Sequence, residues 1–533
     1  MTKELVVHRW HEALLVLGGL LWLAAGCQSQ PADLQVTVMA DGAAHRVTVV
    51  GGTVREAVAA AGVALGALDQ VTPDLWQEVT PDLQVRVVRV QEVEEAERRA
   101  IPFERRVLRS EAMADGESRL VQLGQQGEEE IVYRVTLHDG QEQSRVEVRR
   151  EALRPVVHEV QVVGIRSHLP STPLEGTIAY LSGGNAWLMR GESGGRRPLT
   201  TAGDLDGRVF ALASDGQWLL FSRMAADPDA PQINSLWVVE TTVLGQEPLP
   251  LGIESVVYGG WSPDGRRIAY STAERSRGSP GWKAHNDLWV AQVALPSPHL
   301  KQTVAAPVVT PTLAVEGDAS GLYAWWGSSF SWSPSGEHVA YATATTVGVI
   351  HLARGERQEL LTFPEYHTYA EWVWTPALSW APDGRYLVCS LHAATGGEAV
   401  LGDSPWFHVH ALRLDGAVQA PLVEGAGMWA NPQWGRAALG GGWPIAYGQS
   451  RSLTSSQDSE YDLYVMDRDG SDKRLLFPQP NEPGLVAPQF AWSPSRAHLV
   501  LAWQGDLYLV NAETGGAERL TGDGNSGQPQ WAR

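Results

Sequence analysis

The chain has 533 residues, a formal net charge of −20 at pH 7 and a hydrophobic content of 44%. This hydrophobic content is enough for a large folded core and excludes a chain that is disordered throughout. The acidic balance argues against nucleic acid as a partner, because phosphate binding requires a basic face. Since the only cysteines are Cys27 and Cys389, no disulfide framework can be inferred.

The first 27 residues have the pattern of an export signal. Lys3 and Arg9 precede an apolar run at 13–25, which is too short to span a bilayer because a spanning helix needs about 20 residues. The run ends in small residues directly before Cys27, and this ending resembles the lipobox of bacterial lipoproteins. The resemblance implies cleavage before Cys27, lipidation of its thiol and anchoring on the outer side of the cell membrane, with residues 28–33 as a tether. The alternative is an ordinary cleaved signal in which Cys27 has no role.

Residues 34–91 have the pattern of a small hairpin, helix and returning strand. Two runs of period two, at 35–38 and 45–50, flank an Asp-Gly turn, which is typical of a β-hairpin. Thr53 and Glu56 match a capping box and predict a helix after Thr53, and a further strand is predicted at 83–90. This order is that of a β-grasp fold. The module resembles the ubiquitin-like DUF348 repeat of resuscitation-promoting factors and related Gram-positive cell-wall proteins.

Residues 92–166 contain strands that are polar on both faces. Runs at 132–136 and 144–148 flank an Asp-Gly turn, and such strands predict a thin, extended sheet with little core. The segment resembles the G5 domain of surface adhesins and peptidoglycan enzymes. Its glycines fall at matching places: Gly116, Gly124, Gly127, Gly140 and Gly164. The resemblance implies extracellular work and an affinity for N-acetylglucosamine-containing polymers, although a role as spacer and tether is favoured over sugar binding.

After a linker at 167–175, one turn phrase recurs up to the end of the chain. Trp-Ser-Pro-Asp-Gly at 261–265 precedes an apolar run, and its Pro, Asp and Gly suit successive positions of a tight turn. Aligning the Trp or its substitute gives Leu212, Trp261, Trp332, Trp380, Trp434, Trp492 and Trp531. A four-stranded blade takes about 40–45 residues, so each interval holds one blade, the second, between Trp261 and Trp332, with an insertion.

The repeats resemble the TolB-type β-propeller. We therefore expect a mainly β chain in which residues 176–533 form a propeller of seven blades, with six or eight as alternatives. The strand at 177–180 lacks a preceding first strand, and 528–531 matches a first strand without the rest of its blade. Together the two segments are expected to complete one blade and so remove the free sheet edges.

Aromatic residues in the connections between blades are the candidate ligand site. In a propeller these connections gather around the mouth of the central channel, where exposed rings could stack on sugar faces or hold a hydrophobic peptide. The candidates are Tyr323, Trp325, Trp326, Tyr366, His367, Trp372 and Trp429. Packing between blades is the alternative role, for Trp374 in particular.

Three short patterns could carry chemistry, but each has a simpler structural interpretation. Residues 191–195 match Gly-x-Ser-x-Gly but are predicted to be a turn between two strands, whereas a nucleophile elbow joins a strand to a helix. The acidic turn at 467–472 lacks the distal Glu of an EF-hand. His408 and His410 share a strand face without a third ligand nearby. We therefore predict no catalytic residue, no metal site and no cofactor.

These features predict a membrane-anchored, extracytoplasmic binding or scaffold lipoprotein that recognises a cell-wall glycan or an envelope protein. A propeller-based glycosidase or lyase of the cell envelope is the alternative. A carboxylate pair about 5–9 Å apart at the channel mouth would favour the enzyme. An aromatic mouth without such a pair would favour binding.

Overall fold

We describe a computed structural model of the chain. It describes residues 33–110, 113, 117–164, 169–227, 229–243, 245–296, 306–321, 323–368, 370, 372–393, 405–435, 442–495 and 497–533. The predicted export signal, Cys27 and Gly116 lie outside these residues. Within the described ranges, no helix is long and apolar enough to cross a membrane. The chain divides into two compact units, one comprising residues up to Pro102 with Gln126–Val157, the other Phe103–Gln125 with His158–Arg533.

The first unit begins with a four-stranded sheet and one helix. The elements are β1 (Leu34–Ala40), β2 (Ala43–Val49), α1 (Val54–Ala60), β3 (Gln70–Thr72) and β4 (Leu83–Val88), in the sheet order β2-β1-β4-β3. Strand β1 pairs antiparallel with β2 and parallel with β4, as in a β-grasp fold. At the start of α1, the Glu56 carboxylate accepts a hydrogen bond from the Thr53 backbone N–H at 2.8 Å. The predicted hairpin and helix are therefore confirmed.

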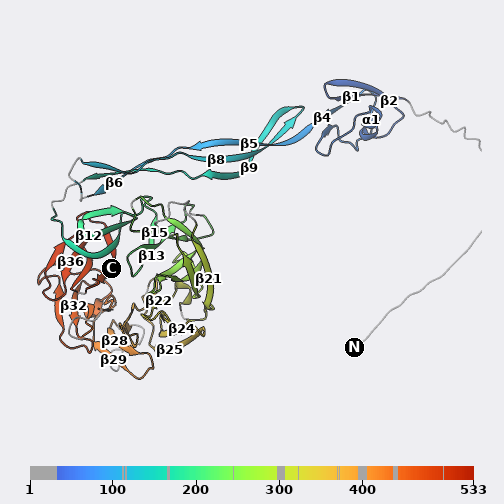
Figure 1. The fold of residues 1–533 in the computed structure, drawn as a ribbon. Coiled ribbons are helices and arrows are strands. Elements are labelled where there is room, and N and C mark those ends of the chain that lie inside the picture. Colours follow the sequence, from blue (N-terminus) through green and yellow to red (C-terminus); the bar gives the residue numbers. More distant parts are fainter. Residues whose placement is uncertain are drawn as a thin grey trace, which may run out of the picture. The chain divides into compact units, whose positions relative to one another are not determined.

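The rest of the first unit is a long three-stranded sheet (Figure 1). It consists of β5 (Val90–Ile101), β8 (Gly127–His138) and β9 (Gln141–Arg154), with β8 in the middle. Every residue of β9 is exposed. Cross-strand ion pairs join Arg145 to Glu95 at 2.8 Å and Arg150 to Glu129 at 3.4 Å. Since exposed ion pairs contribute little net stability, the sheet is held together mainly by the main-chain ladder and by the buried Ile131, Val132 and Val135 of β8.

The second unit begins with a small sheet of strands β6 (Arg105–Ser110), β7 (Ser118–Gln122) and β10 (Glu159–Gly164), in the order β6-β10-β7. Two hydrogen bonds tie it to connections between the strands that follow. The Arg106 guanidinium donates to the Thr201 carbonyl at 3.4 Å, and the Gln122 amide donates to the Glu247 carboxylate at 2.9 Å. Residues 92–166 therefore contribute one sheet to each unit.

From Pro173 onward, the described residues form seven mainly antiparallel sheets. The first holds β11 (Pro173–Ser182), β12 (Asn185–Pro198) and β38 (Ser526–Ala532), and the second β13 (Leu205–Leu212), β14 (Trp218–Met224), β15 (Asn234–Glu240) and β16 (Leu249–Glu254). The third holds β17 (Val256–Trp261), β18 (Arg267–Arg275), β19 (Trp282–Ala284), β20 (Leu288–Ala294) and β21 (Val308–Val315), and the fourth β22 (Ser329–Trp332), β23 (His338–Ala342), β24 (Thr346–His351) and β25 (Glu356–Thr362). The fifth holds β26 (Leu378–Trp380), β27 (Tyr386–His392), β28 (Phe407–Arg413) and β29 (Gln419–Val423), and the sixth β30 (Gln433–Trp434), β31 (Ile445–Ser450), β32 (Tyr461–Met466) and β33 (Arg474–Phe477). The seventh holds β34 (Phe490–Trp492), β35 (His498–Trp503), β36 (Asp506–Asn511) and β37 (Ala517–Arg519).

These sheets lie around a common centre, which is the arrangement of a β-propeller (Figure 1). Four of the repeated Trp residues link neighbouring sheets, because the indole N–H donates to the carbonyl just before the equivalent position of the preceding sheet: Trp261, Trp332, Trp380 and Trp492. Trp332 donates to the Gly260 carbonyl at 3.2 Å, and Trp380 donates to the Ser331 carbonyl at 2.9 Å. The Trp side chain is therefore both an apolar wedge between sheets and a hydrogen-bond donor.

Strand β38 belongs to the sheet in which β11 lies. The two strands pair antiparallel, with Thr177 opposite Ala532 and Ile178 opposite Trp531. Gly176 has a φ of +64°, and a Cβ there would collide with the Ala532 carbonyl oxygen. A glycine is thus required both by the backbone conformation and by the close approach of β38.

Candidate functional site

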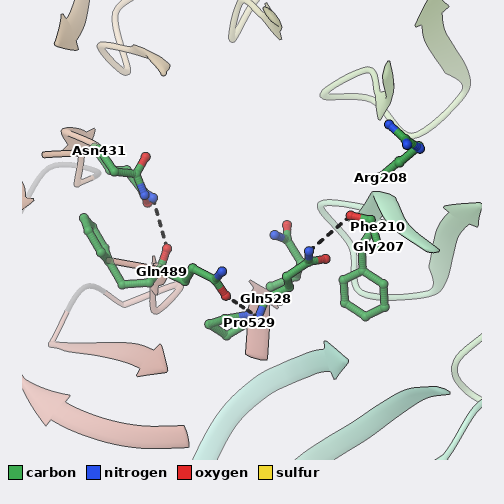
Figure 2. Close-up of a pocket in the computed structure, with 10 residues that line it drawn as sticks. Gly207, Arg208, Phe210, Asn431, Gln489, Gln528 and Pro529 are labelled. Atoms are coloured by element: carbon green, nitrogen blue, oxygen red, sulfur yellow. Dashed lines mark hydrogen bonds between the residues drawn. The ribbon is translucent and has the colours of Figure 1, made fainter. Parts of the chain in front are cut away.

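A cavity of about 340 Å³ lies among the first strands of four sheets of the second unit (Figure 2). We call it the amide pocket, because five of its ten lining residues carry a side-chain amide. The lining residues are Gly207, Arg208, Phe210, Asn431, Gln433, Gln489, Phe490, Gln528, Pro529 and Gln530. They come from β13, β30, β34, β38 and the residues just before β30 and β34. None of the ten is an aspartate or a glutamate, so this pocket lacks the carboxylate pair of a glycosidase.

Three of the five amides bridge to the backbone of a neighbouring sheet. The Asn431 amide nitrogen donates to the Pro488 carbonyl at 3.0 Å, and the Gln433 nitrogen donates to the Phe490 carbonyl at 3.0 Å. The Gln528 nitrogen donates to the Gly207 carbonyl at 3.1 Å. Because a carbonyl can only accept, these bonds fix which end of each amide is the nitrogen.

The fourth amide is used in the opposite sense. The Gln489 side-chain oxygen accepts a hydrogen bond from the Gln528 backbone N–H at 2.8 Å (Figure 2). Its NH₂ group has no protein acceptor among the described residues. The fifth amide, on Gln530, has no hydrogen-bond partner among the residues that the structure describes.

Two residues of the amide pocket have a left-handed backbone conformation. Asn431 has a φ of 41° and Gln528 a φ of 47°, and both lie three residues before a repeated Trp. Positive φ is uncommon outside glycine, and for glutamine it is more costly than for asparagine. Such residues cluster at functional sites, so this pair marks the pocket as a candidate site.

Arg208 is the one charged residue that lines the amide pocket. Its guanidinium lies over the Trp282 ring, 3.8 Å from the ring centroid, and 3.6 Å from the Asp206 carboxylate. Burial lowers the pKa of Arg208, and the nearby Asp206 carboxylate opposes this effect. The group remains protonated at neutral pH, because arginine starts from a pKa above 12.

The structure divides the seven aromatic candidates into groups. Tyr323 precedes the short 3-10 helix η1 (Ala324–Trp326) and meets Trp325, inside that helix, edge to face with centroids 5.4 Å apart. Trp325 is 45% exposed. Trp326 instead packs on Trp282, with centroids 5.6 Å apart. Trp325 is thus available for a ligand, whereas Trp326 is used in part for packing.

The remaining candidates pack more tightly. Trp372 stacks on Trp429 at 5.9 Å, and both lie against the core of the fourth and fifth sheets. Tyr366 contacts the Phe407 ring at 5.1 Å, and the His367 ring lies 3.3 Å from the Glu365 carboxylate. These residues are half-buried.

The short patterns examined for chemistry have structural roles. Residues 191–195 lie inside β12, so their prediction as a turn was wrong; the chain pairs there with residues near Thr172. The Ser193 hydroxyl is buried and accepts a hydrogen bond from the Thr172 N–H at 2.9 Å, which leaves no exposed nucleophile at this serine. The His408 and His410 rings stack at 6.0 Å. Among the described residues, no three His, Cys, Asp or Glu side chains are grouped to hold a metal ion.

Sequence reasoning missed the amide pocket, although a signal was present. Asn-Pro-Gln-Trp at 431–434 and Gln-Pro-Gln-Trp at 528–531 are near-identical and end at repeated Trp residues. The corresponding positions before Trp332 and Trp380 are Ser331 and Ser379. A comparison of the residues before each Trp would have shown where the amides gather.

Two family models match the N-terminal part of the chain. Residues 92–166 match the G5 domain, and residues 36–75 match the G5-linked ubiquitin-like domain. The chain therefore carries a G5 domain. Two of its glycines have structural roles: Gly140 turns the β8–β9 hairpin with a φ of +79°, and a Cβ on Gly127 would lie 2.8 Å from the Val156 nitrogen. No curated protein matches the chain.

Solved structures resemble separate parts of the chain. TolB from Acinetobacter baumannii is 12% identical over 82% of this chain and 99% of its own, with a TM-score of 0.35. The G5 domain of IgA1 protease is 20% identical over 15% of this chain and 94% of its own, with a TM-score of 0.13. An acylaminoacyl peptidase from Pyrococcus horikoshii is 10% identical over 79% of this chain but 52% of its own, with a TM-score of 0.37. At these TM-scores the likenesses carry no argument about function.

Proposed function

We propose that this protein is an extracytoplasmic binding or scaffold lipoprotein that recognises a cell-wall glycan or an envelope protein. A lipid on Cys27 would anchor it to the outer side of the cell membrane. The G5 domain supports an extracellular place of work, and the ending of the apolar run before Cys27 supports the lipid anchor. The G5 and ubiquitin-like modules would act as tether and, for the G5 domain, as a further contact with N-acetylglucosamine-containing polymer.

The make-up of the amide pocket favours a binding role over a catalytic one. It offers hydrogen-bonding groups and apolar surface in one cavity, which is the usual make-up of a ligand site. It holds no carboxylate that could act as acid, base or nucleophile. The enzymatic alternative would require such a group at the reacting centre.

We further propose that the seven sheets form a closed ring of seven blades. The pairing of β38 with β11 supports this, because strands from both ends of the region then lie in one sheet. Strand β38 also contacts β13 of the second sheet and β34 of the seventh. With β38 in place the edge of β11 is paired, and the ring leaves only short, protected strand edges, which protects the protein against edge-to-edge aggregation.

The exposed Trp325 is proposed as a second contact for the partner. An exposed indole next to Tyr323 offers flat apolar surface, which suits either a sugar face or an apolar peptide side chain. Tyr366, His367, Trp372 and Trp429 are half-buried and are proposed as weaker contacts, as is Trp326, which packs on Trp282.

The proposed function is tested by capture from the cell envelope. The mature protein without its lipid, with Cys27→Ser, is incubated separately with purified cell-wall sacculi and with detergent-solubilised envelope proteins. We expect saturable binding to one of the two, and weaker binding of a Trp325→Ala variant with unchanged thermal stability. Binding no stronger than that of heat-denatured protein in both experiments would contradict the proposal.

A further inference from the structure

We infer that the amide pocket binds a neutral carbohydrate residue through the hydroxyl groups of the sugar, which donate to the side-chain oxygens of Asn431, Gln433 and Gln528. This inference rests on the proposed function and names the ligand class of its central site. It follows from which atoms of the pocket are already used in the fold and which remain available.

The hydrogen bonds within the protein leave mainly acceptors facing the ligand. The NH₂ group donates to a backbone carbonyl of a neighbouring sheet in three of the amides, those of Asn431, Gln433 and Gln528. Their amide oxygens have no donor among the described residues, and each oxygen can accept two hydrogen bonds. A ligand that satisfies these oxygens must itself be rich in O–H or N–H donors.

The charges around the pocket restrict the ligand further. The lining has one charged residue, Arg208, which would repel an ammonium group. An anion would instead face three amide oxygens that carry partial negative charge. The Arg208 guanidinium is also already placed over Trp282 and near Asp206. A neutral donor such as a sugar hydroxyl therefore fits better than an ammonium group or a carboxylate.

A small apolar surface adds to the match. Phe210, Phe490 and Pro529 line the same cavity but are themselves buried, so they offer only a narrow contact to the C–H face of a pyranose ring. The NH₂ group of Gln489 and the free amide of Gln530 add donors for the ring or acetamido oxygens of a sugar. The pocket thus has both the acceptors and the donors that a neutral sugar requires.

Calorimetric titration of the mature Cys27→Ser protein tests the inference. The probes are soluble neutral oligosaccharides of hexose and N-acetylhexosamine, the corresponding monosaccharides, and a lysine-rich peptide of similar size. We expect an oligosaccharide to bind with an affinity that is unchanged between low salt and high salt, because no ion pair forms. Tighter binding of the oligosaccharide than of its monosaccharide would indicate a polymer as the natural source, and the reverse a free sugar; both support the inference.

Two variants and a matched control assign the binding to the pocket. Gln530→Leu removes an amide that makes no bond in the fold, and Gln433→Leu removes an acceptor together with its bond to Phe490. Each is expected to weaken oligosaccharide binding about tenfold, as for the loss of one or two hydrogen bonds. Gln419→Leu is the control, because the Gln419 amide makes the same kind of bond, to the Leu360 carbonyl, outside the pocket. Gln419→Leu should lower the free energy of unfolding as Gln433→Leu does, but it should leave the affinity for the sugar unchanged.

The outcomes separate this inference from the proposed function. Capture of an envelope protein without any oligosaccharide binding would overturn the inference and leave the proposed function standing. Oligosaccharide binding that survives both Gln530→Leu and Gln433→Leu would place the sugar elsewhere and overturn the assignment to the pocket. Preferred, salt-sensitive binding of the lysine-rich peptide would overturn the choice of a neutral ligand. Binding to none of these probes, nor to sacculi or envelope proteins, would overturn both.

Discussion

At the scale of single residues, the repeated tryptophans differ in whether the indole N–H makes a hydrogen bond. Trp332 packs between sheets and donates to the Gly260 carbonyl, whereas the indole N–H of Trp434 is buried without a partner. The same side chain therefore gains a hydrogen bond in one sheet and loses hydration without compensation in another. A buried unsatisfied donor is costly, and its removal can be nearly neutral or stabilising.

This difference gives the first prediction. Trp332→Phe should lower the free energy of unfolding of the second unit by about 1–3 kcal/mol through the lost hydrogen bond and indole area. Trp434→Phe should cost clearly less, because no hydrogen bond is lost. Chemical unfolding followed by circular dichroism measures both. Equal losses in the two variants would mean that the indole bond to Gly260 adds nothing.

His410 gives a second prediction, on pH. Burial lowers the pKa of His410 to about 4, and the neighbouring His408 contributes in the same direction. Its Nδ1 atom is buried without a partner. Between about pH 6.5 and pH 4 the unfolded chain binds a proton that the folded chain does not, so stability should fall as the pH falls through this window. Unfolding curves of the wild type and His410→Phe at pH 7 and pH 4.5 test this, and an equally steep loss in both would exclude His410 as a cause.

At the scale of elements, β38 is expected to contribute more to stability than its length suggests. It pairs with β11, and Trp531 contacts the core of that sheet while its indole donates to the Glu175 carbonyl at 2.7 Å. Deletion of Asn525–Arg533 should therefore lower the melting temperature of the second unit markedly and expose the edge of β11 to aggregation. Calorimetry with light scattering measures both effects. An unchanged melting temperature would count against closure of the ring by β38.

The same scale shows what the sequence could predict. The turn phrase after Trp261 is read from local chemistry: Gly265 has a φ of +66°, and the Ser262 hydroxyl accepts the Arg267 N–H at 2.9 Å. Such turns and the strands beside them were predictable because each depends on a few consecutive residues. The role of Gln433 was not predictable, because its amide donates to the Phe490 carbonyl in a different sheet. Which sheet lies beside that of Gln433 follows only from the arrangement of all the sheets. Likewise, the sequence indicated that Trp372 and Trp429 lie in connections but not that they stack on each other.

At the scale of the whole molecule, attachment to the membrane depends on one thiol. If Cys27 carries the lipid, Cys27→Ser should move the protein from the membrane fraction to the soluble extracytoplasmic fraction. Fractionation of cells labelled with a clickable fatty acid measures both the label and the location. A protein that stays membrane-bound and labelled after the substitution would show that the anchor is elsewhere. Cys389 serves as an internal control, because burial raises the pKa of its thiol and leaves it unreactive in the folded protein.

The pairing of β38 with β11 also has a kinetic consequence. Thr177 and Ala532, which face each other, are separated by almost the full length of the region that lies between them. Contacts so distant along the chain form slowly, because a long segment must lose conformational entropy before these contacts can form. The joining of these two strands should therefore be among the last steps of folding. Until then the edge of β11 would be unpaired, and at this stage the protein would depend most on the chaperones of its compartment.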